Sequence, residues 1–419
     1  MNSLIVYTTL LPAFFYLLYV SGCNRKVTPL LVKPFSEEPS REKVLKKPVS
    51  TGPVPARLRS TAVAGAVKES EEEVILNFPK HLQTSDIMHT LPSLCARYAV
   101  IKNKLRQCSL SKSYGSVSRE KKLFEEAMKY ILSKAQLGDM IFNYCYEDYA
   151  IAEHASYKRG LYLSKASHPI AYDIAAPDWD FVATGGFKPW PERLNTLLES
   201  AARNPFDERL NTLFFRGKFT GRMGEGTGRP SLKDPLQNPR YRHFAPRYCS
   251  ETQKFTRING ISIDIACTGR SPEISDSKLR KVLCDYKGAW SKTVPMADHC
   301  KYKYLLSADG RGTQGIRLKE LMACGSVVFM HESKHNESFY HLIQPWVHVI
   351  PYSHDASDLY EKLRWAAQHP EKAKEIAENG QKLIREKVSE SYAVDWWKAF
   401  NKMYEANKPP ESAIQLCGV

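Results

Sequence analysis

The stretch that decides the fold reads D-H-C-K-Y-K-Y-L-L-S-A-D-G-R-G-T-Q-G-I-R-L-K-E-L-M-A-C-G-S-V-V-F at 298–329 and continues to P-W-V-H-V-I-P at 345–351. Its apolar runs predict three strands and one intervening helix. The strands are expected at 302–307, 326–330 and 346–350, and the helix at 316–323. Alternation of strands with helices predicts an α/β fold with a parallel, doubly wound sheet.

The loop Asp309-Gly-Arg-Gly-Thr-Gln-Gly315, between the first strand and the helix, is a candidate binding loop. Glycines let a backbone approach a ligand closely. The N–H groups at a helix N-terminus attract phosphate, and Arg317 has a planar guanidinium that can hold two phosphate oxygens. A tight strand-to-helix turn without a ligand is the alternative interpretation.

A second basic, glycine-rich loop follows the apolar run Leu213-Phe-Phe215, which predicts a strand. It begins R-G-K-F-T-G at 216–221 and ends at Arg229. Either loop alone is also compatible with an ordinary surface turn. Two such loops in one chain favour a site for a diphosphate.

The rest of the chain carries further helical and strand patterns. Apolar periodicity and breaker residues predict helices at 94–108, 121–135, 192–203, 355–368 and 370–388, and strands at 139–145 and 261–266. A stripe of aromatic residues near the C-terminus also has helical spacing, which favours packing over ligand binding: Trp396, Trp397, Phe400 and Tyr404.

Asp148 directly follows the strand predicted at 139–145. A carboxylate at the carboxyl end of a strand faces the crevice in which open α/β sheets bind ligands, where it can take a proton from a hydroxyl. A turn-forming aspartate is the alternative.

Two patterns that suggest metal ligands are rejected. Asp178-Trp-Asp180 is a spacing common by chance, and His331 with His335 lacks a third ligand. The sequence therefore indicates no metal site.

Composition narrows the range of partners and compartments. The chain has 419 residues, a formal net charge of +15 and ten cysteines. A basic protein prefers anionic partners, namely nucleic acid, anionic membrane or phosphorylated ligands. No zinc-finger or ribonucleoprotein motif is present, which disfavours nucleic acid. The cysteines favour an oxidising compartment with disulfides, and Asn336-Glu-Ser338 is an N-glycosylation acceptor pattern.

The N-terminus carries an uncharged apolar run, Leu4–Val20. Its length suits a hydrophobic helix that spans a membrane as a signal anchor. A cleaved signal peptide and a lipid-modified Cys23 are the alternatives. We assign 1–23 to this segment and 24–73 to a disordered stem, because 24–73 is proline-rich and poor in aromatic residues.

Several motifs together resemble one known family. They are D-H-C-K-Y-K-Y at 298–304, D-G at 309–310, R-L-K at 317–319, A-C-G-S at 323–326, F-Y at 339–340, P-W-V-H at 345–348 and I-A-E-N-G at 376–380. F-R-G at 215–217 and P-D-W-D-F at 177–181 fit as well. The chain resembles the Rumi/protein O-glucosyltransferase and capsule-associated xylosyltransferase family, glycosyltransferase family 90, over roughly 139–388.

The resemblance implies a GT-B fold, in which two Rossmann-like lobes enclose a central cleft. The expected parts are an acceptor-side lobe at 74–210, a donor-binding lobe at 211–388 and a C-terminal helix with a tail at 389–419. The implied reaction moves glucose or xylose, with inversion, from a UDP-sugar to a hydroxyl of a glycoprotein or polysaccharide. No metal or other cofactor is expected. The implied location is the lumen of the endoplasmic reticulum or Golgi with a single membrane pass, or secretion if the N-terminal segment is cleaved.

The resemblance also implies roles for particular residues. Asp148 becomes the general base, and Cys300 pairs with Cys324. The residues expected to bind the donor are Arg229, Arg317, Lys218, Thr220, Gly312, Thr313 and Gly315, with Arg222 as a replacement for Arg229.

Two departures from the family pattern stand out. Ala150 replaces the usual proline, and Gln314-Gly315-Ile316 replaces a segment that usually carries a serine. The second departure motivates an alternative function, a non-catalytic relative that binds a glycan or acts as a chaperone.

Overall fold

The computed structural model describes residues 83–88, 91–92, 94–111, 118–147, 150, 161–169, 171, 173–182, 188–219, 257–270, 291–310 and 312–418. All of them belong to one compact unit, Val67–Val419. The N-terminal apolar run and the stem expected at 24–73 lie outside the described residues. Within the described part, no helix is long and apolar enough to cross a membrane.

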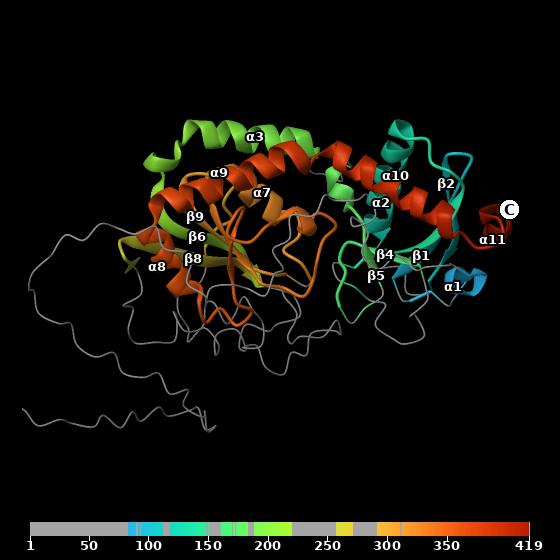
Figure 1. Cartoon of the computed structure of the whole chain (residues 1–419), viewed down its shortest axis with the longest axis horizontal. Coiled ribbons are helices and arrows are strands. Elements are labelled where there is room, and N and C mark those ends of the chain that lie inside the picture. Colours follow the sequence, from blue (N-terminus) through green and yellow to red (C-terminus); the bar gives the residue numbers. More distant parts are fainter. Residues whose placement is uncertain are drawn as a thin grey trace, which may run out of the picture. The chain divides into compact units, whose positions relative to one another are not determined.

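The stretch quoted first supplies β9, β10 and β11, one half of a six-stranded sheet ordered β11-β10-β9-β6-β8-β7; Figure 1 labels β9, β6 and β8 of this sheet. All of its strand pairs are parallel except β7 with β8. The predicted parallel sheet is therefore present apart from one edge strand. Its strands are β6 (Leu210–Phe219), β7 (Arg257–Ile258), β8 (Ile261–Arg270), β9 (Tyr302–Ser307), β10 (Val327–His331) and β11 (Ile350–Tyr352).

Both faces of this sheet are covered, as alternation along its strands requires. On β6, Phe214 belongs to one buried cluster, whereas its neighbours Leu213 and Phe215 belong to another. The first cluster includes residues of α7 (Arg317–Ala323), and the second includes residues of α8 (Leu359–Gln368); α9 (Pro370–Lys387) contributes to both. The sheet is thus a central layer between helices.

A second sheet precedes it in the chain, in the order β2-β1-β3-β4-β5. β1 is antiparallel to β2 and β3, whereas β3, β4 and β5 are parallel. This sheet is therefore mixed and not the fully parallel layer that a Rossmann-like lobe implies. Its strands are β1 (Cys95–Ile101), β2 (Lys104–Leu110), β3 (Met140–Cys145), β4 (Tyr162–Ser164) and β5 (Asp173–Ala175), with α1 (Thr84–Met88) and α2 (Ser118–Lys134) beside them.

The helix predicted at 94–108 is wrong. The segment forms the β1–β2 hairpin, because Lys102 and Asn103 both adopt positive φ, 49° and 58°, as a two-residue hairpin turn requires. The Asn103 side chain fixes this turn by accepting from the N–H of Leu137 at 3.0 Å and donating to Leu132 O at 2.9 Å. These contacts are distant in sequence, so the local pattern did not reveal them.

Two boundaries also differ from expectation. The strand predicted at 346–350 begins only at Ile350, because Trp346 has a φ of 64° and closes a turn in which its N–H donates to Val349 O at 2.7 Å. The helix predicted at 355–368 begins at Leu359. Asp355 precedes it in a serine-rich turn, where hydrogen bonds from Ser357 lower the pKa of the aspartate to about 2.

The C-terminal segment runs from one sheet to the other. The aromatic stripe predicted to pack is buried in α10 (Glu390–Asn407), which contacts α2 and β3. The final helix, α11 (Ala413–Cys417), contacts β1 and is joined to β2 by the disulfide Cys108–Cys417. One continuous buried cluster includes side chains of both sheets, which explains why they form a single unit. The domain boundaries stay predictions.

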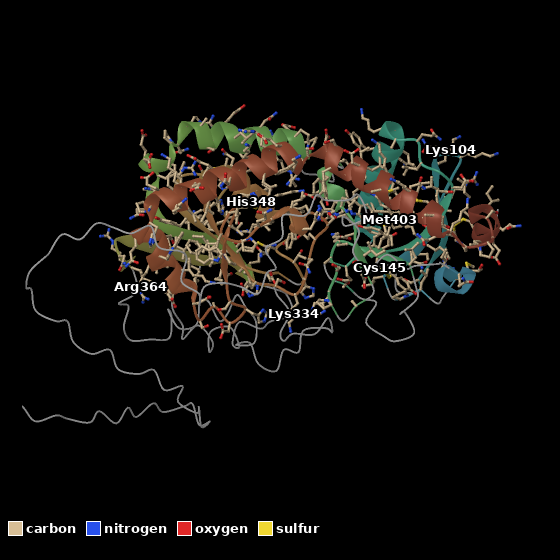
Figure 2. All side chains as sticks on the ribbon, in the orientation of Figure 1. Lys104, Cys145, Lys334, His348, Arg364 and Met403 are labelled. Carbon is tan, nitrogen blue, oxygen red and sulfur yellow. A yellow bond between two sulfur atoms is a disulfide. The ribbon has the colours of Figure 1, made fainter. Side chains whose placement is uncertain are left out.

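Gly380 of α9 lies against the loop that precedes β11. A Cβ at this position would lie 2.6 Å from His348 O (His348 is labelled in Figure 2). Glycine is normally unfavourable inside a helix, so its use here follows from the lack of space. Two of the motifs that carry the family resemblance therefore touch each other.

We predict that Gly380→Ala lowers the free energy of unfolding by about 1–3 kcal/mol, because the new methyl group overlaps a backbone carbonyl. Lys382→Ala, at an exposed position of the same helix, is the matched control. Urea denaturation of both variants measures the difference. Equal or greater stability of Gly380→Ala would show that the loop yields without cost.

Candidate functional site

The strand order of the six-stranded sheet locates a candidate site. From β6 the chain continues towards β8 on one side, whereas β9 lies on the other side of β6. Open α/β sheets bind ligands at the carboxyl ends of the strands where the order reverses in this way. The loops after β6 and β9 begin at this point, and they are the two basic loops singled out from sequence.

Arg317 connects these two loops. It follows the β9 loop as the first residue of α7, and its Nη1 donates to Arg216 O at the end of β6. Its guanidinium carbon lies 5.3 Å from the centroid of the Phe215 ring. A Cβ at Gly217 would lie 2.7 Å from the same ring and 3.6 Å from Arg317 Nη2. Only glycine leaves room for this arrangement.

Two arginines, Arg216 and Arg317, lie together at this edge of the sheet. Burial, and then the charges of Arg317 and Arg216, lower the pKa of His299 to about 4, so this histidine is neutral. Arg216 has a structural partner, because its Nη2 lies 2.8 Å from Asp264 Oδ1. Burial lowers the pKa of Arg317, with Glu320 acting in the opposite direction. The contacts described for the Arg317 guanidinium are the Phe215 ring and the backbone carbonyl of Arg216. A guanidinium in this position favours an anionic ligand.

A buried side chain holds the β9 loop, the segment between β9 and α7, by hydrogen bonds. Gln314 is 4% exposed, and its side chain accepts from Ser307 Oγ and donates to His331 O at 3.2 Å. The residue that departs from the family pattern therefore anchors the loop to β9 and β10. Gly315 has a φ of 63°, which glycine adopts without strain. Gly312 and Thr313 are buried in the same loop.

The other residues predicted to bind the donor are only partly described. Lys218 is exposed near the end of β6, while Thr220, Arg222 and Arg229 lie outside the described residues. Asp148 also lies outside them; the last described residue before it is Glu147, just after β3. The roles of these four residues stay predictions. Because α7 has only seven residues, its dipole contributes little, and the phosphate hypothesis depends mainly on arginine.

A buried cluster of charges connects α7 to the segment that follows β5 of the five-stranded sheet. Lys319 Nζ lies 2.7 Å from Asp180 Oδ2, and Arg193 of α3 (Trp190–Arg203) lies 2.9 Å from the same oxygen and 2.6 Å from Glu320 Oε1. Lys319 and Asp180 are 1% and 3% exposed. Lys319 Nζ also lies 3.5 Å from the centroid of the Phe181 ring. Asp180 is thus the counter-ion of two cations.

His331 and His335 do not share a helix face, contrary to the spacing considered from sequence. His331 ends β10 and is fully buried; its Nδ1 lies 3.1 Å from Asp309 Oδ2, and its Nε2 lies 3.0 Å from His354 O. Burial acts to lower the pKa of His331, but Asp309 outweighs it and the pKa is raised. Among the described residues, no group of three or more His, Cys, Asp or Glu is placed to hold a metal ion.

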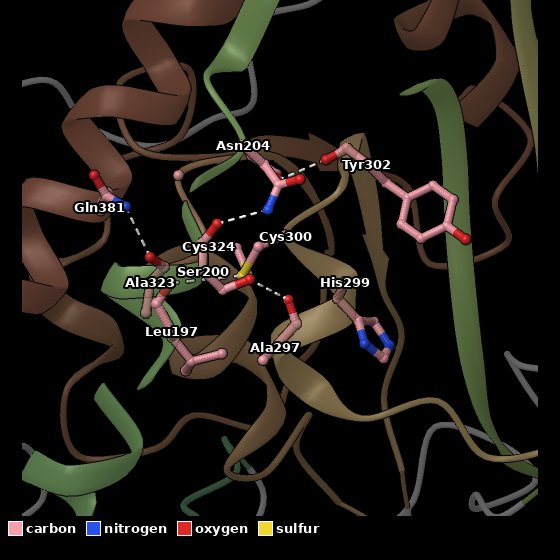
Figure 3. The surroundings of a disulfide bond; sticks show 12 residues. Leu197, Ser200, Asn204, Ala297, His299, Cys300, Tyr302, Ala323, Cys324 and Gln381 are labelled. Atoms are coloured by element: carbon pink, nitrogen blue, oxygen red, sulfur yellow. Dashed lines mark hydrogen bonds between the residues drawn. A yellow bond between two sulfur atoms is a disulfide. The ribbon is translucent and has the colours of Figure 1, made fainter. Parts of the chain in front are cut away.

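The disulfide implied by the resemblance is present. Cys300 follows α6 (Met296–His299) and pairs with Cys324 at the end of α7 (Figure 3). Beside it, Gln381 of α9 donates to Ala323 O at 2.9 Å, and Ser200 of α3 donates to Ala297 O at 2.7 Å. The unit formed by β9 and α7 is thereby fixed to helices on the same face of the sheet.

Three further residues, Asn336, Glu337 and Tyr340, follow β10 in the chain. Asn336 has an exposed side chain, although its backbone pairs with that of Ser167. Sequence reasoning assigned no role to Glu337 or to the Tyr340 hydroxyl, which donates to Glu337 Oε1 at 3.2 Å. A carboxylate just before the apolar run of Phe339-Tyr340 was the available signal.

The fold and these loops define a mixed α/β protein with a candidate anion site at a reversal of strand order. Residues 263–407 match the sequence model of glycosyl transferase family 90. Protein O-glucosyltransferase 2 of Danio rerio is 39% identical over 156 residues, which cover 37% of this chain and 30% of that protein. Protein O-glucosyltransferase 1 of Homo sapiens is 28% identical over 247 residues, which cover 54% and 52%.

Residues 263–407 are therefore similar to a glycosyl transferase family 90 domain, and the resemblance drawn from the motifs is confirmed. These matches span about half of the human relative and less of the zebrafish one. A solved glycosyltransferase from Rickettsia africae aligns with 71% of this chain and 84% of its own, at 10% identity and a TM-score of 0.33.

We predict that Asp180→Asn lowers the free energy of unfolding by about 3–5 kcal/mol, because it leaves the buried ammonium of Lys319 with an uncompensated charge. Asp395→Asn removes the partner of Lys398 from an exposed pair and is the matched control; we expect little change there. Chemical denaturation of the two variants tests this. Similar stability of both would mean that Lys319 finds another partner.

Proposed function

We propose that the chain is a glycosyltransferase with a GT-B arrangement, which moves glucose or xylose from a UDP-sugar to a hydroxyl of a glycoprotein or polysaccharide. One observation carries the proposal. The region that matches the family contains the β9 loop, and Arg317 joins this loop to the end of β6 at the reversal of strand order. This is where α/β sheets bind nucleotides.

The proposed donor site stabilises the diphosphate with arginine in place of a metal ion. The guanidinium of Arg317 is planar and can donate to two phosphate oxygens. Its charge is the second cause, after burial, of the lowered pKa of His299. As the bond to the sugar breaks, negative charge grows on the leaving UDP, and fixed donors in a partly buried site stabilise that charge without reorganising. Arg229, or Arg222 in its place, is proposed as the second cation.

The proposed reaction inverts the anomeric centre. Asp148, just beyond β3, takes the proton from the acceptor hydroxyl. At the same time the oxygen of that hydroxyl attacks the anomeric carbon, in line with the leaving UDP. General-base assistance of this kind contributes about 10²–10⁴-fold.

The compartment is also part of the proposal. Three disulfides in the described residues, Cys95–Cys145, Cys108–Cys417 and Cys300–Cys324, suit an oxidising compartment. We therefore propose the lumen of the endoplasmic reticulum or Golgi, reached through the apolar N-terminal run, either retained as a signal anchor or cleaved.

We predict that Arg317→Ala weakens binding of UDP-glucose about 10- to 100-fold, because charged hydrogen bonds to the diphosphate are lost. Arg317→Lys should be intermediate, since it keeps the charge and loses the planar fork. Arg203→Ala, which removes an exposed arginine of α3, is the control. Isothermal titration calorimetry measures the affinities, and undiminished binding by Arg317→Ala would exclude this donor site.

We predict that Asp148→Asn lowers UDP release by about 10²–10⁴-fold while binding of UDP-glucose is retained. The assay uses UDP-glucose and UDP-xylose with glycoprotein and polysaccharide acceptors, and Glu147→Gln is the control. Full turnover by Asp148→Asn removes Asp148 as the base. Donor binding by the wild-type protein with no turnover for any acceptor would favour the alternative, a non-catalytic glycan-binding or chaperone-like relative.

A further inference from the structure

The side chain of Glu337 lies behind the β9 loop, in the segment between β10 and the short helix at Tyr340–Leu342. Its carboxyl group accepts from the Tyr340 hydroxyl at 3.2 Å and from the side chain of Thr313. Thr313 belongs to the loop that Arg317 follows. Glu337 is therefore in direct contact with the proposed donor loop, although it is remote from it in sequence.

Both partners of Glu337 are bound in turn to loop backbone. The Thr313 hydroxyl accepts from the N–H of Gly315 at 3.2 Å, and the Tyr340 hydroxyl accepts from the N–H of Gln314. Two consecutive amides, those of Gln314 and Gly315 just before the N-cap residue of α7, are thus held by side chains that meet at one carboxyl group. The direction in which Arg317 leaves the loop depends on this backbone.

The surroundings of Glu337 favour its neutral form. Burial is the main cause that raises its pKa to about 7; Thr313 and Lys319 act to lower the pKa, while Asp178 and Asp180 raise it further. Asp309 faces the same tyrosine. The neutral acid can accept from Tyr340 and also donate a proton, whereas the carboxylate adds a negative charge near two aspartates.

We propose that Glu337 is a positioning residue of the proposed donor site, which fixes Gln314 and Gly315 through Tyr340 and Thr313 and so sets the place of Arg317. The proposal rests on the proposed function, since it concerns the same site. Because the carboxylate form adds a buried negative charge beside the loop that would hold an anionic donor, donor binding is expected to be strongest below about pH 7 and to weaken as the pH rises through that value.

Titration of UDP-glucose from pH 5.5 to 8.5 by calorimetry tests the proposal. A terminal phosphate ionises near pH 6, so a diphosphate esterified at both ends is the better probe. Four proteins are compared: wild type, Glu337→Gln, Glu337→Ala and the control Glu332→Gln, which changes an exposed carboxylate in the same segment. Thermal melting of each verifies that it is folded.

The expected result separates the proteins by pH profile. Wild type and Glu332→Gln lose about tenfold in affinity for UDP-glucose as the pH rises past 7. Glu337→Gln binds like wild type at pH 6 and shows no such loss. Glu337→Ala binds about tenfold more weakly than wild type at pH 6, and its affinity stays at that level at every pH. If the pH profile of Glu337→Gln is identical to that of wild type, the role of Glu337 is overturned and the donor site is not. This comparison remains decisive even if Glu337→Ala does not fold. Failure of wild type to bind UDP-glucose at any pH overturns the donor site itself, and this role with it.

Discussion

The ion pair between Lys319 and Asp180 is the contact on which the site depends. Two opposite charges are removed from water together, and either one alone would be costly to bury. Lys319 belongs to the helix that follows the β9 loop, and Asp180 belongs to the segment that follows β5 of the five-stranded sheet. The requirement that these charges meet ties α7 to α3 through Arg193. The helix that follows the β9 loop is therefore fixed in position.

Three other constraints act on the same loop from different sides. The disulfide Cys300–Cys324 ties the start of β9 to the end of α7, Gln314 anchors the loop to His331 at the end of β10, and Glu337 contacts the loop through Thr313. A loop held in this way presents its arginine with little loss of conformational entropy when a ligand binds. The rigidity of the β9 loop is the physical basis for the proposed donor site.

Much of the secondary structure could be predicted from the sequence, because the sequence patterns that indicate it are local. Strands β6, β8, β9 and β10 are apolar runs bounded by polar or glycine residues, and α9 begins at a proline and ends near Val388. The failures have a common cause. The hairpin at Lys102-Asn103 depends on contacts with Leu132 and Leu137, and the turn at Trp346 depends on a positive φ that no local pattern encodes.

The sequence by itself determined the α/β class, the two basic loops and the family, since each depends on residue type and short spacing. Only the tertiary structure decided which side chains meet. It paired Asp180 with Lys319, turned Gln314 inward, placed Arg317 against Phe215 and brought Glu337 to Thr313. The physical reason is that the energy of a buried charge or hydrogen bond depends on its partner and on exclusion of water, and both are set by packing between segments far apart in the chain.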